Sequence, residues 1–153
     1  MKVKEIMVRD VKSISPDINV KEALDTLWKT GISGLPVIGE NNKLVGMFTE
    51  REALAYLLPS YIGQVGKFVY EDNPKVIKKK LAELAQVKIS QIMRKDVVTV
   101  TQDMALYELA RVMVTEKARR TPVVDEQGKV IGMVSRVDIL PALIKEAQEA
   151  SGI

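Results

Sequence analysis

Apolar residues recur with a helical period in two separate stretches of the chain. Within 20–28 they stand at positions i, i+3, i+4, i+7 and i+8, and within 106–114 they occupy the same five places. This spacing gives a helix one apolar face, so we expect amphipathic helices over both stretches. Asn19, with Glu22 three residues later, matches a capping box at the start of the first helix.

Each predicted helix is followed by two short apolar runs separated by polar turn residues. The runs cover 35–38 with 44–48, and 122–124 with 130–134. Two such runs joined by a short polar turn are typical of a β-hairpin. A shorter extended run precedes each helix, at 11–15 and at 97–101.

The two halves of the chain are copies of one another. Residues 3–52 align with 89–138 without a gap. Matching residues include Ile6-Met7 with Ile92-Met93, Asp10-Val11 with Asp96-Val97, Pro36-Val37 with Pro122-Val123, and Gly46-Met47 with Gly132-Met133. Each copy has the order β-α-β-β-α, and its period is too long for a solenoid. We therefore predict an α+β fold (α/β-like), with two pseudo-symmetric repeats packed as one module.

The repeat sets the expected domain limits: repeat 1 over 1–58, a connector over 59–88, and repeat 2 over 89–153. The connector predicts a lysine-bearing helix at about 74–86, preceded by aromatic residues at 61, 68 and 70. We expect the connector to pack on its own module or on a dimer mate. Alternatively, it forms an arm that docks a partner or covers a ligand. The last helix is expected to start near Arg136 and to bend or break at Pro141.

Composition narrows the classes of function. The chain has 153 residues, 46% of them hydrophobic, which is enough for a real core. It contains no histidine and no cysteine, which removes the commonest general base, the commonest transition-metal ligand and any thiolate nucleophile. We therefore expect neither an enzyme nor a metal site nor a cofactor.

Charge and hydropathy add expectations about partners and location. The net charge of +3 permits anion binding without requiring nucleic acid. No apolar run approaches the roughly 20 residues that span a bilayer. No signal core follows the charged start of the chain. We expect a cytoplasmic protein with no membrane partner and no nucleic-acid partner.

Two strand–turn–helix junctions carry the candidate chemistry. Thr49 with Glu52 fits a capping box, which explains the first junction without a ligand. Ser135 with Asp138 fits that role less well, because Asp is one methylene shorter than the Glu usually found there. We expect Asp138 to project outward, where it can accept hydrogen bonds from adjacent hydroxyls such as those of a ribose. A cap and a ligand grip both stay open for this second turn.

The surroundings of the second turn suit a phosphate. A helix N-terminus presents free N–H groups and the positive end of the helix dipole. Gly132 leaves space beside the backbone, which we interpret as room for a ligand. Arg119 and Arg120 precede the neighbouring strand and suit phosphate oxygens. The first repeat has Ser33 and Gly34 at these places.

These motifs are similar to those of a known family. They are Ile-Met near each start, Leu-Pro-Val-Ile or Thr-Pro-Val-Val on the first hairpin strand, and Gly-Met-Phe-Thr-x-x-Glu or Gly-Met-Val-Ser-x-x-Asp at the junctions. The chain resembles a tandem pair of cystathionine-β-synthase (CBS) domains, called a Bateman module. The resemblance covers both repeats and leaves out most of the connector.

The resemblance implies a stand-alone regulatory module. Such modules bind adenosine-containing ligands (AMP, ADP, ATP or S-adenosylmethionine) in the cleft between the repeats, and here the signal would pass to a separate, unknown effector protein. Such modules commonly associate through their helices, so the resemblance also implies a homodimer. The alternative is a ligand-free protein-interaction or dimerisation scaffold, and a nucleic-acid-binding role is less favoured.

The resemblance also implies site residues. Ser135 and Arg120 would meet phosphate, and Asp138 the ribose. The opposing repeat would contribute Ser15, Ala23 and Ser33, with Ile32 a candidate for stacking on adenine.

A second, pseudo-symmetric site would use Thr49, Glu52, Thr101 and Arg119. There the longer Glu52 carboxylate would crowd the ribose, and Gly34 stands where the arginine would be. We expect one good site and one weakened or empty site.

Overall fold

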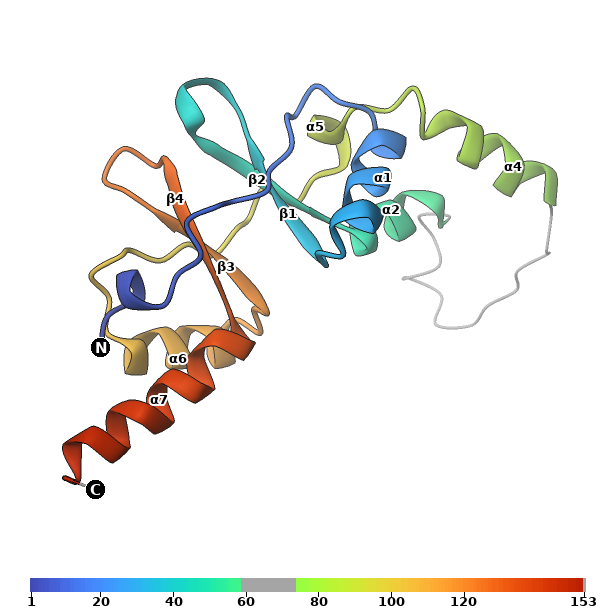
Figure 1. The fold of residues 1–153 in the computed structure, drawn as a ribbon. Helices are drawn as coiled ribbons and strands as arrows, with labels where there is room; N and C mark the ends of the chain where they lie inside the picture. Colours follow the sequence, from blue (N-terminus) through green and yellow to red (C-terminus); the bar gives the residue numbers. More distant parts are fainter. Residues whose placement is uncertain (59–73, 153) are drawn as a thin grey trace. The chain divides into compact units, whose positions relative to one another are not determined.

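The computed structural model describes residues 1–58 and 74–152 and has an α+β fold with two compact units (Figure 1). The aromatic residues at 61, 68 and 70 of the predicted connector lie outside these residues. Unit 1 comprises Met1–Ser13, Ile38–Leu44 and Asp96–Ile153, and unit 2 comprises Ile14–Val37 and Val45–Lys95. Each unit thus contains pieces of both repeats. The domain limits expected from the sequence repeat, 1–58, 59–88 and 89–153, therefore stay a prediction.

The predicted helices and hairpins of both repeats are confirmed. In chain order the elements are η1 (Val3–Glu5), α1 (Val20–Thr30), β1 (Gly34–Ile38), η2 (Glu40–Asn42), β2 (Leu44–Thr49), α2 (Glu50–Leu57), α4 (Pro74–Glu83), α5 (Ile89–Ile92), α6 (Leu106–Thr115), β3 (Arg120–Val124), β4 (Val130–Ser135) and α7 (Arg136–Ala150). Strands β1 and β2 form one two-stranded sheet, and β3 and β4 form another. The predicted extended runs are reduced to single parallel bridges, Ile14 with Val37 and Val100 with Val123.

Helix α1 begins at the predicted cap, Asn19, and ends at Thr30, two residues beyond the predicted stretch. Asn19 Oδ1 accepts the backbone N–H of Glu22 at 2.9 Å, and Asn19 Nδ2 donates to Glu22 Oε1 at 2.9 Å. At the other end Gly31 adopts a left-handed conformation (φ 68°) and donates its N–H to Leu27 O at 2.9 Å. These bonds satisfy backbone groups that a helix terminus leaves free.

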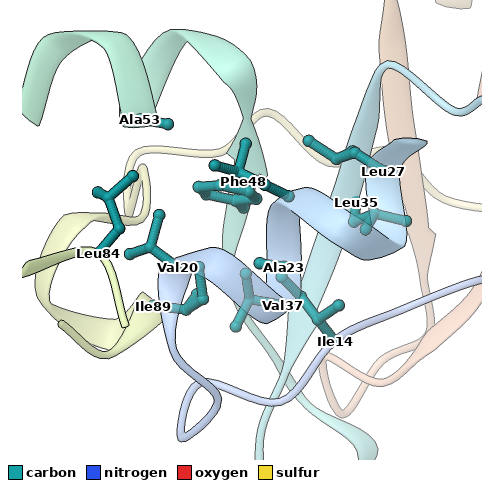
Figure 2. Close-up of a cluster of buried hydrophobic side chains, with 11 residues drawn as sticks. Ile14, Val20, Ala23, Leu27, Leu35, Val37, Phe48, Ala53, Leu84 and Ile89 are labelled. Atoms are coloured by element: carbon teal, nitrogen blue, oxygen red, sulfur yellow. The ribbon is translucent and has the colours of Figure 1, made fainter. Parts of the chain in front are cut away.

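The cores of the two units use equivalent positions of the two repeats. Figure 2 shows the unit 2 cluster, in which α1, β1 and Phe48 pack with Leu84 and Ile89. Its counterparts in unit 1 are Val100 for Ile14, Leu106 for Val20, Leu109 for Ala23, Met113 for Leu27, Val123 for Val37, Val134 for Phe48 and Ile139 for Ala53. Thr121 replaces Leu35 and is the buried polar residue of this part of the chain, with no exposed surface.

One predicted core position is wrong in both repeats. Trp28 and Val114 occupy the i+8 place, yet their side chains are 62% and 78% exposed. At 100° per residue this place lies at the edge of the apolar arc, beyond the first four positions.

The short segment at the start of each repeat belongs to the unit that holds the second hairpin strand of the other repeat, and it completes the core of that unit. Val3 of η1 is fully buried in the unit 1 cluster, and Ile89 of α5 is fully buried in the unit 2 cluster. The chain following each segment pairs with a hairpin. Val8 exchanges backbone hydrogen bonds with Met133 at 2.8 and 2.9 Å, and Arg94 does the same with Met47 at 2.9 Å each.

Two glycines make room for these crossing segments. A Cβ on Gly46 would lie 2.7 Å from Met93 Sδ and 2.8 Å from Arg94 O. A Cβ on Gly132 would lie 2.8 Å from Met7 Sδ. The space beside Gly132 is therefore filled by the chain's own Met7, and the interpretation of that glycine as room for a ligand is wrong.

The connector helix α4 is held to α2 within unit 2. It ends at Glu83, three residues before the predicted limit. Tyr56 donates its hydroxyl to Glu83 Oε2 at 2.6 Å, and Lys80 Nζ lies 4.7 Å from the centroid of the Tyr56 ring. The hydrogen bond to Glu83 raises the pKa of Tyr56.

Helix α7 continues through Pro141 without a break (Figure 1), so the predicted break is wrong, while a bend at this residue stays a prediction. Pro141 is exposed, so the carbonyl left without its helical donor can be hydrated. The face that carries Val137, Leu140 and Ile144 is exposed (78%, 64% and 52%), and α7 packs instead through Ile139 and its neighbours. Among the described residues no helix is long and apolar enough to cross a membrane.

Candidate functional site

The second turn places Ser135 and Arg120 side by side in unit 1. Arg120 at the start of β3 lies directly opposite Ser135 at the end of β4. Arg136 donates its backbone N–H to Arg119 O at 3.0 Å, so the flanking residues make the interstrand bond. A pair of this kind holds its side chains close together on one face of the sheet. The arginine and the hydroxyl therefore share a face at the N-terminus of α7.

Asp138 closes this turn from the first helical turn of α7. Its Oδ2 accepts the backbone N–H of Ser135 at 3.0 Å and the Ser135 hydroxyl at 2.8 Å. The expectations that Asp138 projects outward and that this pair fits a capping box less well are therefore both wrong, because the capping box forms here. Because the Ser135 N–H points away from β3, the aspartate side chain can reach it although it is shorter than that of glutamate. The other oxygen, Oδ1, has no hydrogen-bond partner among the described residues.

Arg120 carries an unsatisfied donor. Its side chain is partly buried, and its Nε is buried without a hydrogen-bond partner in the part of the chain that the structure describes. Arg111 on α6 is different, because it forms an ion pair with Glu108 that also lowers the pKa of that carboxyl. A buried donor without a partner is costly, most of all when it is charged. Such an atom points to an acceptor that the polypeptide itself does not supply.

The loop before Arg120 is fixed by a residue that sequence reasoning missed. Arg136 donates its Nε to Ala118 O at 2.9 Å, in addition to its backbone bond to Arg119. It thus ties the start of α7 to the loop that leads into β3. Its place directly after Ser135 was the one signal available in the sequence.

The first turn, in unit 2, is built differently. Thr49 Oγ1 accepts the N–H of Arg51 at 3.1 Å, which confirms the cap, and its hydroxyl donates to Glu52. Glu52 meets the hydroxyl and, among the described residues, does not meet the Thr49 N–H that the capping box predicts. A Cβ on Gly34 would lie 3.0 Å from Thr49 Cγ2, so Gly34 has the place beside this turn that Arg120 has beside the other.

The backbone N–H groups of the two turns also differ. Arg51 and Val137 occupy equivalent positions, and the Arg51 N–H is taken by the Thr49 hydroxyl. Within the described ranges no side chain accepts the Val137 N–H. The α7 terminus therefore keeps a free donor that α2 has used for its cap.

The other predicted site residues belong mostly to unit 2. Ser15 is exposed and its Oγ accepts the Asp17 N–H at 3.2 Å. Ala23 is fully buried in the core, Ile32 is partly buried against that core, and Ser33 is exposed. Their roles in binding stay predictions.

The structure brings together two groups of predicted residues. Arg120, Ser135 and Asp138 form one group in unit 1, and Thr49 and Glu52 form the other in unit 2. Thr101 and Arg119 are exposed residues of unit 1. No group of acidic side chains in the described ranges is arranged to hold a metal ion.

Known proteins share this architecture. A model of the CBS domain matches residues 3–59 and 89–145. An inosine-5'-monophosphate dehydrogenase of Methanocaldococcus jannaschii is 32% identical over 139 residues, which cover 91% of this chain and 23% of that enzyme. The chain thus spans less than a quarter of that relative.

Two crystal structures with adenosine-containing ligands are similar to this chain. CBSX2 of Arabidopsis thaliana in complex with AMP gives a TM-score of 0.72 at 25% identity, covering 95% of this chain and 98% of CBSX2. The CBS domain pair of protein MJ0100, in complex with 5'-methylthioadenosine and S-adenosyl-L-methionine, gives 0.68 at 26% identity, with 95% and 98% covered.

Proposed function

We infer the function from the family and from the second turn: the chain belongs to the CBS domain family, and we propose that it is a regulatory module that binds an adenine nucleotide of the AMP, ADP or ATP type. The observation that carries the proposal is the grouping of Arg120, Ser135 and Asp138. Together they place an arginine whose buried Nε has no partner and a carboxylate oxygen without a partner, held by the Ser135 hydroxyl, at one helix N-terminus within the described residues. A phosphate and a ribose supply the groups that these atoms lack.

Each atom has a distinct role in the proposal. Arg120 and the Val137 N–H bind phosphate oxygens, aided by the positive end of the α7 dipole. Asp138 Oδ1 accepts a ribose hydroxyl while Oδ2 keeps the turn closed. Ser135 positions the carboxylate by donating its hydroxyl to it.

The first turn is proposed to be the weaker site. The Arg51 N–H is already used within the cap, whereas among the described residues the equivalent Val137 N–H is not, and Gly34 provides no charge beside the turn. We propose that Thr49, Glu52, Thr101 and Arg119 bind a ligand weakly or not at all.

The output of the module is proposed to pass to a separate protein, and the chain itself is proposed to act without catalysis. We propose that the chain forms a homodimer through the exposed faces of α6 and α7, because these faces carry large apolar side chains. Those that are more than half exposed are Tyr107 and Val114 on α6 and Val137, Leu140 and Ile144 on α7. The alternative function, a ligand-free scaffold, rests on the same surface. A cytoplasmic location stays a prediction.

Thermal unfolding with added nucleotide tests the proposal. A ligand at 100 times its Kd stabilises by about 2.7 kcal/mol, or roughly 5–11 °C for a chain of this size. We expect AMP, ADP or ATP to shift wild type and Glu52→Ala alike, and to shift Asp138→Ala far less. Each variant is compared with its own ligand-free melting temperature, because both lose a cap.

Two results decide against the proposal. If no adenine nucleotide shifts wild type, the scaffold is the better function. If Asp138→Ala responds as wild type does while Glu52→Ala does not, the nucleotide binds at the first turn.

A further inference from the structure

We propose that the outward face of the connector helix α4 is a docking surface for an acidic helical segment of a partner protein. The inference deepens the proposed function, in which the output passes to a separate protein, and it rests on that function for the role of the partner as an effector. Helix α4 lies between the two residue ranges that the CBS domain model matches, so the CBS domains themselves do not account for its lysines.

The inward face of α4 is already occupied within unit 2. Leu84, directly after the helix, is buried in the unit 2 core. Tyr56 on α2 binds both polar groups of this face: its hydroxyl donates to Glu83 Oε2 at 2.6 Å, and Lys80 Nζ lies 4.7 Å from its ring centroid. These contacts fix which side of α4 meets α2, and they leave the opposite side exposed.

The outward face of α4 carries positive charge without a compensating carboxylate from the same helix. Lys75, Lys78 and Lys79 are exposed, and their spacing of three and four residues places them on one side of the helix. The acidic residue of α4 is Glu83, which is bound to Tyr56 on the other side. Lys78 and Lys79 form no ion pair in the described part of the chain. Their ammonium groups are therefore available to a partner.

A further lysine, on α1, continues this basic surface at the C-terminal end of α4. Lys21 is exposed, and its backbone N–H donates to Leu84 O at 3.3 Å. Of the two α1 carboxylates that follow Lys21, Glu22 is bonded to Asn19, and Asp25 lies a full turn further along the helix. The positive charge thus extends along α4 and past its end, which favours an elongated acidic partner over a single small anion.

The mixed character of this face favours a protein over a nucleic acid or a membrane. Val76 and Leu81 flank the row of lysines on either side and are 49% and 51% exposed. A helix with carboxylates along one stripe and apolar side chains beside it complements both features, whereas a phosphate backbone offers nothing apolar to cover them. A bilayer interface requires a broad apolar face, and on α4 the lysines separate Val76 from Leu81.

Fluorescence anisotropy with a labelled synthetic peptide tests the inference. The probe is an amphipathic peptide of about 20 residues, long enough to form a helix, with glutamates on one stripe and leucines beside it. We expect wild type to bind it at least about ten-fold more tightly than Lys78→Glu/Lys79→Glu does, because the reversal replaces attraction by repulsion at two contacts. Glutamate is a good helix former, so α4 is retained, and circular dichroism verifies this.

The matched control is Lys29→Glu/Lys95→Glu, which has the same net charge and changes two exposed lysines of unit 2 outside α4. It should bind the acidic peptide as wild type does. Equal binding by wild type and Lys78→Glu/Lys79→Glu, an equal loss in both double variants, or no binding to wild type overturns the inference. Tighter binding of a single-stranded oligonucleotide than of the acidic peptide also overturns it and assigns the face to nucleic acid.

Nucleotide binding is measured on the same samples to separate the two proposals. AMP should raise the melting temperature of wild type and of Lys78→Glu/Lys79→Glu alike, because the second turn belongs to unit 1 and α4 to unit 2. If AMP stabilises both proteins and the peptide does not bind, the docking surface alone is refuted. If the peptide binds as expected and no adenine nucleotide stabilises wild type, the proposed nucleotide-binding function is refuted and the docking surface stands.

Discussion

Gly46 gives the sharpest test of how the crossing segments are packed. An alanine Cβ there would lie 2.7 Å from Met93 Sδ, 2.8 Å from Arg94 O and 2.9 Å from Met93 Cγ. Carbon contacts are normally about 3.5–4.0 Å. Methionine can bend away, but Arg94 O is held by its hydrogen bond to the Met47 N–H at 2.9 Å. The Gly46→Ala substitution must therefore displace the backbone pairing between Met47 and Arg94.

The expected cost of Gly46→Ala follows from these contacts. Overpacking costs about 1–3 kcal/mol, and a contact with fixed backbone belongs at the upper end. The smaller freedom of alanine in the unfolded chain returns roughly 0.4–1 kcal/mol. We expect a net loss of about 2 kcal/mol, which lowers the melting temperature by roughly 4–8 °C.

Gly132→Ala is the matched control. Its shortest contact, 2.8 Å, is with the flexible Met7 Sδ, and the nearest backbone atom, Val8 O, is 3.2 Å away. We expect it to cost about 1 kcal/mol less than Gly46→Ala. Urea denaturation followed by circular dichroism measures both free energies of unfolding. Equal costs, or a larger cost at Gly132, would refute the reasoning.

Three further predictions concern the cores and the connector. Thr121→Val should raise the free energy of unfolding by about 1 kcal/mol, because the buried Thr121 hydroxyl has no partner in the described residues; a lower melting temperature would show that the hydroxyl is satisfied. Val3→Ala should cost about 2 kcal/mol and speed amide hydrogen exchange in α6 and β4 rather than in α1, whereas faster exchange confined to α1 would contradict the placement of η1 in unit 1. Because the hydrogen bond to Glu83 raises the pKa of Tyr56 above the ordinary value of about 10, the stabilisation from this bond is present below about pH 10 and is lost as pH rises through the folded-state pKa. Wild type should therefore lose stability relative to Tyr56→Phe above about pH 10 in alkaline denaturation, and parallel curves would count against the Glu83 bond.

The periodicity of apolar residues predicted the helices and hairpins because those elements are set by local pattern. It could not predict which hairpin receives which crossing segment. Ile6-Met7 and Ile92-Met93 are identical in sequence, so nothing in the chain distinguishes pairing within a repeat from exchange. Only the folded chain shows that Met7 fills the space beside Gly132. The same limit explains why that glycine was misinterpreted.

Local chemistry at the turns was partly predictable. The hydroxyl cap at Thr49 follows from its position before a helix. The behaviour of Asp138 does not, because it depends on the strand register that turns the Ser135 N–H away from Arg120. The same register brings Arg120, fifteen residues earlier in the chain, to the turn. The unsatisfied Arg120 Nε could be found only from burial.

A two-dimensional amide NMR titration with AMP tests the central claim most directly. If the second turn is the nucleotide site, the amides of Arg120, Ser135, Val137 and Asp138 shift with a common Kd, while those of Arg51 and Glu52 shift less or only at higher concentration. Saturable shifts confined to the Thr49–Glu52 turn, or no shifts at millimolar AMP, would contradict the account.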